Sequence, residues 1–313
     1  MTTEVRPRRS VLYLPASNER AIRKAATLEC DTLILDLEDA VSPDAKDQAR
    51  RNAVAAVRAR SFGRREVVVR VNALETPWGE DDLALVSEAG PDAILVPKIN
   101  EVADLSRYTQ ALVQAPSQTA LWAMVETTRS LFRLDEIAAA GVSSRLSVLV
   151  VGTNDLAKEM RAELDPGRAP FLGTLGLIVA AARAYGLGVI DGVFNDLDDN
   201  EGFAAQCEQG RAFGFDGKTL IHPSQIALSN AAFSPSGSVV DLARRIIAAF
   251  DEPENRGSGA IRLDGKMVER LHLTQAKDTL AVHEAIVAAR EIPETEGVVD
   301  SMLISSNRHR TAD

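Results

Sequence analysis

The 313-residue chain has only 2 cysteines and 4 histidines, and aromatic residues make up 4% of it. Cys30 and Cys207 cannot build a disulfide scaffold and neither belongs to a CxxC pair, so we expect a reducing, cytoplasmic setting. No apolar run approaches the roughly 18 residues of a membrane helix, and the apolar stretch after MTTEVRPRRS is too short for a signal peptide. The 35 Lys and Arg against 45 Asp and Glu give a net charge of −10, which argues against nucleic-acid binding.

Several common catalytic motifs are also missing. The chain contains no GxGxxG and no GxSxG pattern. GFDGKT resembles a phosphate-binding loop, but Ala212 stands where that loop requires its first glycine. His283 and Glu284 begin a zinc-protease pattern whose second histidine is replaced by Val287.

The dominant pattern is a set of eight short runs rich in Val, Ile and Leu that alternate with helical stretches. Each run is apolar on both faces, as expected of parallel strands that are covered on both sides. Eight such strands favour an α/β fold of the (β/α)₈ TIM-barrel type over an open sheet. The expected strands are residues 11–14, 32–37, 67–71, 93–96, 121–125, 146–151, 188–193 and 218–221.

The rhythm changes after Pro223. We expect a helix over 239–250, a polar linker, an extended piece over 260–268 and a helix over 271–290. The chain is thus predicted to contain a catalytic barrel domain, residues 1–230, and a C-terminal helical extension, residues 231–313.

Reacting groups in a β/α barrel lie at the carboxyl ends of the strands. In this chain those ends carry many acids and two cations. In chain order, the polar residues there are Asp36, Glu38, Asp39, Arg70, Asn72, Lys98, Glu126, Asn154, Asp155, Asp191, Asn195 and His222.

Glu126 and Asp155 follow consecutive predicted strands, which lie about 4.8 Å apart in a sheet. Two carboxylates so close repel each other unless a cation or a proton lies between them. Mg²⁺ prefers one or two carboxylates together with water and substrate oxygens. We therefore predict that the pair holds a divalent ion, and a lysine ammonium between the two would count against this. The alternative is that each residue only caps the helix that follows.

Arg70, within VVVRVN, needs a partner in so apolar a strand. It forms either a structural ion pair with one of the acids or a fork for a substrate carboxylate. Lys98, in LVPKI, has the same two interpretations, and the ion pair is favoured. His222 is either a base or a residue that starts a helix.

Seven segments resemble the citrate lyase β-subunit family of the HpcH/HpaI aldolase superfamily, which includes malyl-CoA lyases. They are RRSVLYLPASN at 8–18, LILDLEDAVSPDAKDQAR at 33–50, VVVRVN at 67–72, ILVPKI at 94–99, MVETTRSL at 124–131, VGTNDLAKEM at 151–160 and KTLIHPSQI at 218–226. The resemblance spans about residues 8–290. It implies a TIM barrel with a helical extension, assembled as a homotrimer or homohexamer.

By matching motif, the resemblance also implies roles for individual residues. Glu126 and Asp155 take the positions of the Mg²⁺ ligands, and Arg70 takes the position that grips the carboxylate of a 2-oxo acid. Glu38 and Asp39 are acidic residues that support the reaction from the LEDAV segment.

Further roles follow from the same resemblance. The backbone at Gly152 and Thr153 lies beside the oxo acid, and Arg9 contacts CoA. The family's extension carries an M-I-D-x-P-H-type motif whose Asp reaches a neighbouring subunit's active site. Here Glu269 replaces that Asp and Leu271 replaces the Pro. Glu269 is then either a base that is one methylene longer or a surface residue of the lid.

The main functional prediction is an Mg²⁺-dependent carbon–carbon lyase that joins or separates a short acyl-CoA and a 2-oxo acid. One alternative is a thioesterase that hydrolyses malyl-CoA on the same scaffold, and another is a 2-oxo acid aldolase that needs no CoA. A non-enzymatic binding protein is disfavoured because clustered acids destabilise the fold without a cation. The sequence leaves open which oxo acid and acyl group are used, and whether CoA or a carrier protein holds the thioester.

Overall fold

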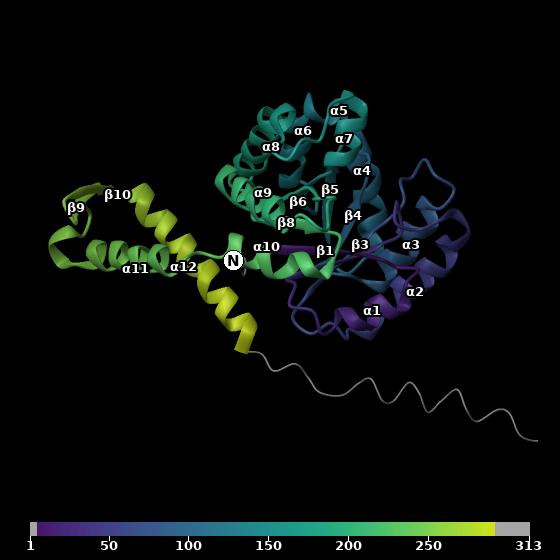
Figure 1. Cartoon of the computed structure of the whole chain (residues 1–313), viewed down its shortest axis with the longest axis horizontal. Coiled ribbons are helices and arrows are strands. Elements are labelled where there is room, and N and C mark those ends of the chain that lie inside the picture. Colours follow the sequence, from purple (N-terminus) through teal and green to yellow (C-terminus); the bar gives the residue numbers. More distant parts are fainter. Residues whose placement is uncertain (1–4, 292–313) are drawn as a thin grey trace, which may run out of the picture.

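The computed structural model describes residues 5–291 and contains a closed barrel of eight parallel strands. The barrel closes because β1 (Ser10–Pro15) pairs with both β2 and β8. The other strands are β2 (Thr32–Asp36), β3 (Glu66–Arg70), β4 (Ala93–Val96), β5 (Ala120–Val125), β6 (Leu146–Val151), β7 (Gly188–Asp191) and β8 (Gly217–Leu220). The predicted TIM barrel with a C-terminal extension is therefore confirmed (Figure 1).

Helices between the strands cover the outside of the barrel (Figure 1). Asn18 and Asp199 begin two of them, since their side chains accept backbone N–H bonds from the first turn. Gly90 ends α3 and Gly214 ends α9, the helix that Asp199 begins, both in the left-handed conformation with φ of 71° and 98°. The barrel helices are α1 (Glu19–Ala25), α2 (Lys46–Ala59), α3 (Gly79–Ala89), α4 (Val102–Ala111), α5 (Thr128–Leu131), α6 (Leu134–Ala139), α7 (Thr153–Met160), α8 (Leu172–Ala184), α9 (Asn200–Phe213) and α10 (Ile226–Phe233).

Strand residues alternate between two cores. Ten inward-facing side chains fill the barrel itself, and the outward-facing ones pack under the helices. The inner set is Val11, Ile34, Val68, Ala93, Leu95, Trp122, Met124, Val148, Val150 and Ile190. The alternation continues to the strand ends, so Asp36 follows Ile34 inward and Arg70 follows Val68 inward.

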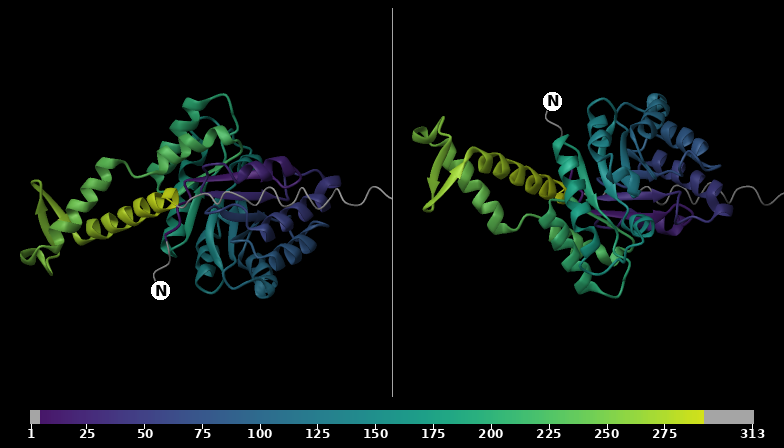
Figure 2. Two further views of the ribbon diagram at one scale, coloured as in Figure 1. Left: turned by 90° about the horizontal axis from the view of Figure 1, so that it is seen from below. Right: turned by 90° about the horizontal axis from the view of Figure 1, so that it is seen from above.

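The C-terminal extension is built around two helices, α11 (Gly237–Asp251) and α12 (Arg270–Glu291). A hairpin of β9 (Ala260–Leu263) and β10 (Lys266–Glu269) joins them, where a single extended piece was expected. Asp264 and Gly265 make its turn with φ of 50° and 79°, as Asp-Gly hairpin turns require. Figures 1 and 2 show that this unit projects away from the barrel. It has its own small core of Ala243, Ile246, Phe250, Ile261, Val268 and Ala276.

The expected domain boundary at residues 230/231 falls inside α10. This helix contacts β1, β8 and α9, so it belongs to the barrel, and the extension begins after Phe233. Residues 292–313 of the expected extension lie outside the described residues. Within residues 5–291, no helix is both long and apolar enough to cross a lipid bilayer.

Candidate active site

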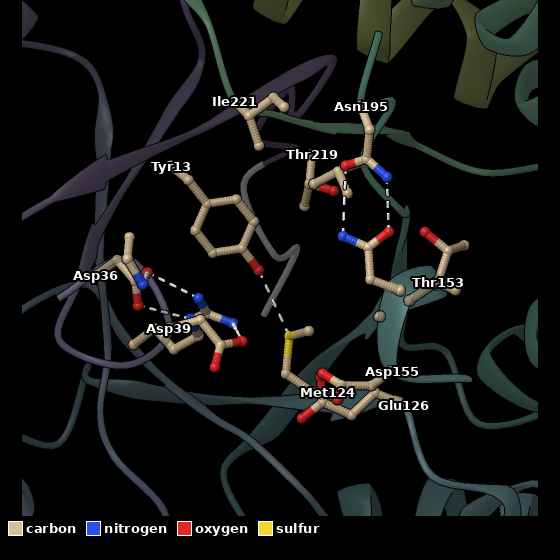
Figure 3. A pocket seen from close by; sticks show the side chains of 16 residues that line it. Tyr13, Asp36, Asp39, Met124, Glu126, Thr153, Asp155, Asn195, Thr219 and Ile221 are labelled. Atoms are coloured by element: carbon tan, nitrogen blue, oxygen red, sulfur yellow. Dashed lines mark hydrogen bonds and ion pairs between the residues drawn. The ribbon is translucent and has the colours of Figure 1, made fainter. Parts of the chain in front are cut away.

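A cavity of about 280 Å³ opens at the carboxyl ends of the barrel strands. Figure 3 shows Tyr13 and Asp36 on one side of it and Glu126 and Asp155 on another. Its lining residues are Tyr13, Asp36, Asp39, Ala40, Arg70, Met124, Glu126, Val151, Gly152, Thr153, Asn154, Asp155, Val193, Asn195, Thr219 and Ile221.

Arg70 is held in the cavity wall by a two-point ion pair with Asp36. The distances from Nε to Oδ1 and from Nη2 to Oδ2 are both 2.7 Å. Nη1 lies 2.8 Å from Glu38 and 3.6 Å from Asp39, and the guanidinium lies 4.8 Å from the ring centroid of Tyr13. The structure shows the ion-pair interpretation of Arg70, and the guanidinium lies in the cavity wall.

The two charges of this cluster have shifted pKa values. Burial alone would lower the pKa of Arg70, but Asp36 and the other acidic neighbours raise it well above its ordinary value. Burial raises the pKa of Glu38 to about 8, although Arg70 acts in the opposite direction. Arg70 therefore stays charged, whereas burial favours the protonated form of Glu38.

The loop after β2 is fixed by hydrogen bonds from its surroundings. The Lys46 ammonium donates to the carbonyls of Leu37 and Glu38 at 2.7 and 2.8 Å and to Asn72 at 2.7 Å. Asn72 in turn donates to the Leu37 carbonyl at 2.9 Å. These contacts hold the backbone that carries Glu38 and Asp39.

Glu126 and Asp155 do lie together, and a lysine ammonium lies between them. Lys98 Nζ is 2.5 Å from Asp155 Oδ2 and 3.4 Å from Glu126 Oε1, and the backbone N–H of Lys98 donates to Glu126 Oε1 at 2.8 Å. Burial raises the pKa of Glu126, while Lys98 acts against this. Lys98 therefore forms the ion pair that was favoured from the sequence. Its ammonium lies between Glu126 and Asp155, which counts against the prediction that these two carboxylates hold a metal ion.

Two further observations nevertheless fit a cation at the same place. Glu126 Oε2 is buried and has no hydrogen-bond partner among residues 5–291, which is costly for a carboxylate. Gly152 passes so close that a Cβ there would lie 2.6 Å from Glu126 Oε2. Three or more His, Cys, Asp or Glu ligands are not gathered anywhere in the described chain. The donor set is thus two carboxylates with open positions, which suits Mg²⁺, provided that Lys98 moves.

The remaining predicted residues are divided between this cavity and more distant places. Gly152 and Thr153 line the cavity as predicted, and the Thr153 hydroxyl is buried without a partner among residues 5–291. Arg9 instead lies at the opposite end of β1, where Nε and Nη2 bind Asp31 at 2.8 and 2.7 Å. The implied contact of Arg9 with CoA is therefore not supported. Glu269 lies on β10, in the projecting extension, and does not reach this chain's own cavity (Figure 1).

Asp191 also turns away from the cavity. It is the residue after inward-facing Ile190 and therefore points outward, where it is buried against Arg168 at 2.6 Å and Lys218 at 3.0 Å. This triad ties β7 and β8 to the loop before α8. Strand-end position alone could not separate Asp191 from the inward-facing acids, whereas the two-residue alternation does.

Sequence reasoning missed two features of the cavity. Tyr13 was counted only as part of an apolar strand, although it lies two residues after inward-facing Val11 and stacks on Arg70. Asn154 and Asn195 pair their amides, with Asn195 donating at 2.8 Å and Asn154 at 3.4 Å (Figure 3). Both asparagines stood at predicted strand ends, but nothing in the sequence indicated that they contact each other.

Comparisons with known proteins agree with this architecture. The family model described as HpcH/HpaI aldolase/citrate lyase matches residues 9–223. A (3S)-malyl-CoA thioesterase of Cereibacter sphaeroides is 49% identical over 290 residues, which cover 93% of this chain and 99% of that protein. An L-malyl-CoA/beta-methylmalyl-CoA lyase of the same species is 35% identical over 309 residues, covering 90% and 96%.

A solved structure provides a third comparison. The protein CitE of Mycobacterium tuberculosis, in complex with magnesium, acetoacetate and coenzyme A, is 30% identical. It superposes with a TM-score of 0.70 over 89% of this chain and 98% of that one.

These comparisons overturn the main functional prediction. Four relatives that are 46–49% identical over nearly their whole length are thioesterases, which are hydrolases, whereas the lyases among the relatives are only 32–35% identical. The prediction of a carbon–carbon lyase is wrong on this evidence. Thioesterases and lyases both resemble this chain over about nine-tenths of its length, so the resemblance identifies the scaffold and not the reaction. The chain belongs to the HpcH/HpaI aldolase/citrate lyase family.

Proposed function

We propose that this protein is an Mg²⁺-dependent thioesterase that hydrolyses malyl-CoA or a closely related short acyl-CoA. The observation that carries the proposal is the 49% identity to a (3S)-malyl-CoA thioesterase over 99% of that protein's length. The cavity supports it, because it joins a fixed positive charge at Arg70 to a carboxylate pair suited to a divalent ion.

Glu126 and Asp155 are the residues that would hold Mg²⁺ in this proposal. When bound, Mg²⁺ supplies Lewis acidity to substrate oxygens and balances the two carboxylates. Glu126 offers Oε2, its unpartnered oxygen, and Gly152 leaves the space beside it open.

Arg70 would orient the free carboxylate of the substrate. Asp36 already fills the fork of Arg70 and Glu38 contacts Nη1, so the attraction would come from the positive charge of Arg70 rather than from an unoccupied bidentate edge. The cation–π contact with Tyr13 holds the guanidinium plane in place. The substrate would therefore be anchored at two points, one at Arg70 and one at the carboxylate pair.

Hydrolysis requires a water oxygen to attack the thioester carbonyl carbon while the carbon–sulfur bond breaks. The water loses a proton to a base, and the CoA sulfur gains one as it leaves. Glu38 would make this exchange, because it borders Arg70 and burial raises its pKa to about 8. Asp39, which is more exposed, is the second carboxylate on that loop.

We also propose a homotrimer or homohexamer in which the hairpin of one copy carries Glu269 to the cavity of the next. Support comes from the extension, which projects away from its own barrel (Figure 2). Light scattering gives the subunit number. Glu269→Gln should lower turnover without changing that number.

Product analysis tests the function. The protein is incubated with (3S)-malyl-CoA, with Mg²⁺ or with EDTA, and the products are separated. Free CoA and malate, formed only with Mg²⁺, are the expected result. Acetyl-CoA and glyoxylate as the products would contradict the proposal.

A further inference from the structure

Lys98 is the one cation in direct contact with both carboxylates of the proposed metal site within the described chain. It follows β4 in the left-handed backbone region, with a φ of 54°, which is unusual for a residue with a side chain. In this conformation the backbone N–H and the side-chain ammonium of Lys98 each contact one of the two carboxylates. Its N–H binds Glu126 Oε1, and its ammonium binds Asp155 Oδ2.

The ammonium occupies the position between the carboxylates that a divalent ion needs. Its single charge balances only one of the two carboxylates, and Glu126 Oε2 keeps no partner among residues 5–291. Burial alone would lower the pKa of Lys98, but Glu126 and Asp155 raise it, so the side chain is charged there.

The ion pair between Lys98 and Asp155 is open to solvent. The side chain of Lys98 is 35% exposed, and that of Asp155 is 29% exposed. A partly exposed ion pair of this kind contributes little to stability. Withdrawal of the ammonium into the open cavity or solvent leaves the N–H bond to Glu126 intact.

We propose that Lys98 is a positioning residue that stands in for the divalent ion: its ammonium holds Glu126 and Asp155 together in the metal-free protein and leaves when the ion binds. The inference rests on the metal site of the proposed function. It adds that the Lys98 ammonium competes with the divalent ion and so limits the affinity of the site for metal. It also adds that the same ammonium keeps Glu126 and Asp155 together when no metal is bound.

Mn²⁺ binding to the full-length protein tests this, measured by calorimetry and electron paramagnetic resonance at pH 8 for the wild type, Lys98→Met, Lys98→Arg and Lys158→Met. Lys158 lies exposed on α7, three residues beyond Asp155, and is the matched control. Lys98→Met should bind Mn²⁺ about fivefold to tenfold more tightly than the wild type, since the competing ion pair is gone. Lys98→Arg should restore weaker binding, and Lys158→Met should leave the affinity unchanged.

An affinity for Mn²⁺ in Lys98→Met that is equal to or weaker than that of the wild type would overturn the proposal. Absence of Mn²⁺ binding in the wild type would overturn the metal site itself, and with it both proposals, so the two failures are distinguishable. A second measurement needs no variant. Acetylation of lysines in the wild type, followed by mass spectrometry, should show Lys98 becoming more reactive relative to Lys158 when Mg²⁺ is added. An unchanged ratio would also overturn the proposal.

Discussion

Arg70 and Asp36 are direct partners across two neighbouring strands, and their side chains form a two-point ion pair inside the barrel mouth. The register of β2 and β3 places the two residues opposite each other as the last residues of their strands. Both side chains are at least nine-tenths buried. The sheet pairing therefore sets the position of the positive charge that the substrate would meet.

Replacing Asp36 with Asn should disrupt that position. The substitution removes the negative charge that pairs with the buried guanidinium of Arg70 and replaces one accepting oxygen by an amide group. Breaking a buried ion pair in this way costs about 3 kcal/mol of stability. We expect the free energy of unfolding in urea to fall by about this amount and kcat/KM to fall by about 100-fold or more. Glu136→Gln, which breaks an exposed pair with Arg133, is the control and should change stability by less than about 1 kcal/mol. Equal effects of the two substitutions would contradict the role of Asp36.

Gly152→Ala should distort the carboxylate pair. The new Cβ would lie 2.5 Å from Cβ and 2.6 Å from Oε2 of Glu126, so Glu126 must move. We expect a loss of about 1–3 kcal/mol of stability together with weaker Mn²⁺ binding, measured by calorimetry. Gly173→Ala is the matched control, since nothing lies within 4 Å of that position on α8. If the Gly152 variant bound Mn²⁺ as tightly as the wild type, Glu126 would not be a ligand.

Stability should depend on pH through Glu38. Its pKa of about 8 in the folded protein is well above the ordinary value of 4.5, so the folded state binds this proton more tightly than the unfolded state. The resulting stability is fully present below the ordinary value and is lost as the pH rises through about 8. Urea unfolding between pH 5 and pH 9 should show the decline, and Glu38→Gln should reduce its slope. Parallel curves for the two proteins would show that Glu38 titrates normally.

Glu126→Gln and Asp155→Asn should each abolish metal binding while the barrel stays folded. Both substitutions keep the size of the side chain and remove a negative charge from the proposed ligand pair. We expect turnover with Mg²⁺ to fall by about a thousandfold or more, with melting temperatures near that of the wild type by circular dichroism. The Glu136→Gln control should keep full activity. Wild-type turnover in either ligand variant would contradict the proposal that Glu126 and Asp155 hold an Mg²⁺ ion needed for the reaction.

The fold was predictable because strands buried on both faces leave a strong apolar signal. Each of the eight expected runs overlaps an observed strand, from β1 to β8. The hairpin of β9 and β10 was not predicted, although Asp264 and Gly265 carried its turn signal. The Asp-Gly pair has a high propensity for a hairpin turn, but the sequence analysis treated residues 260–268 as one extended piece and so missed the reversal of the chain.

The candidate site was predictable in part. Position at a strand end brought Glu126, Asp155 and Arg70 together correctly, since parallel strands share one carboxyl edge. The side-chain contacts of Lys98 and Asp191 could not be predicted from position at a strand end. No sequence signal indicated that the ammonium of Lys98 contacts Asp155. Asp191 faces outward because it lies on the other side of its strand from Ile190.

The reaction itself was not predictable from these motifs. The quoted segments identify a barrel scaffold with Glu126 and Asp155 lining its cavity. Lysis breaks the carbon–carbon bond between the α-carbon of the thioester and the hydroxyl-bearing carbon and keeps the thioester, whereas hydrolysis breaks the carbon–sulfur bond. None of those segments specifies which bond breaks. The higher identity to a thioesterase than to a lyase over nearly the whole chain is what supports the proposal of hydrolysis.

Incubation with (3S)-malyl-CoA in ¹⁸O-labelled water tests the central claim most directly, because it follows the attacking oxygen atom. Mass spectrometry of the products formed with Mg²⁺ should show malate carrying one ¹⁸O atom in a carboxylate, and no such malate with EDTA or with Glu126→Gln. Unlabelled malate, or acetyl-CoA and glyoxylate in its place, would show that water does not attack the thioester in this cavity.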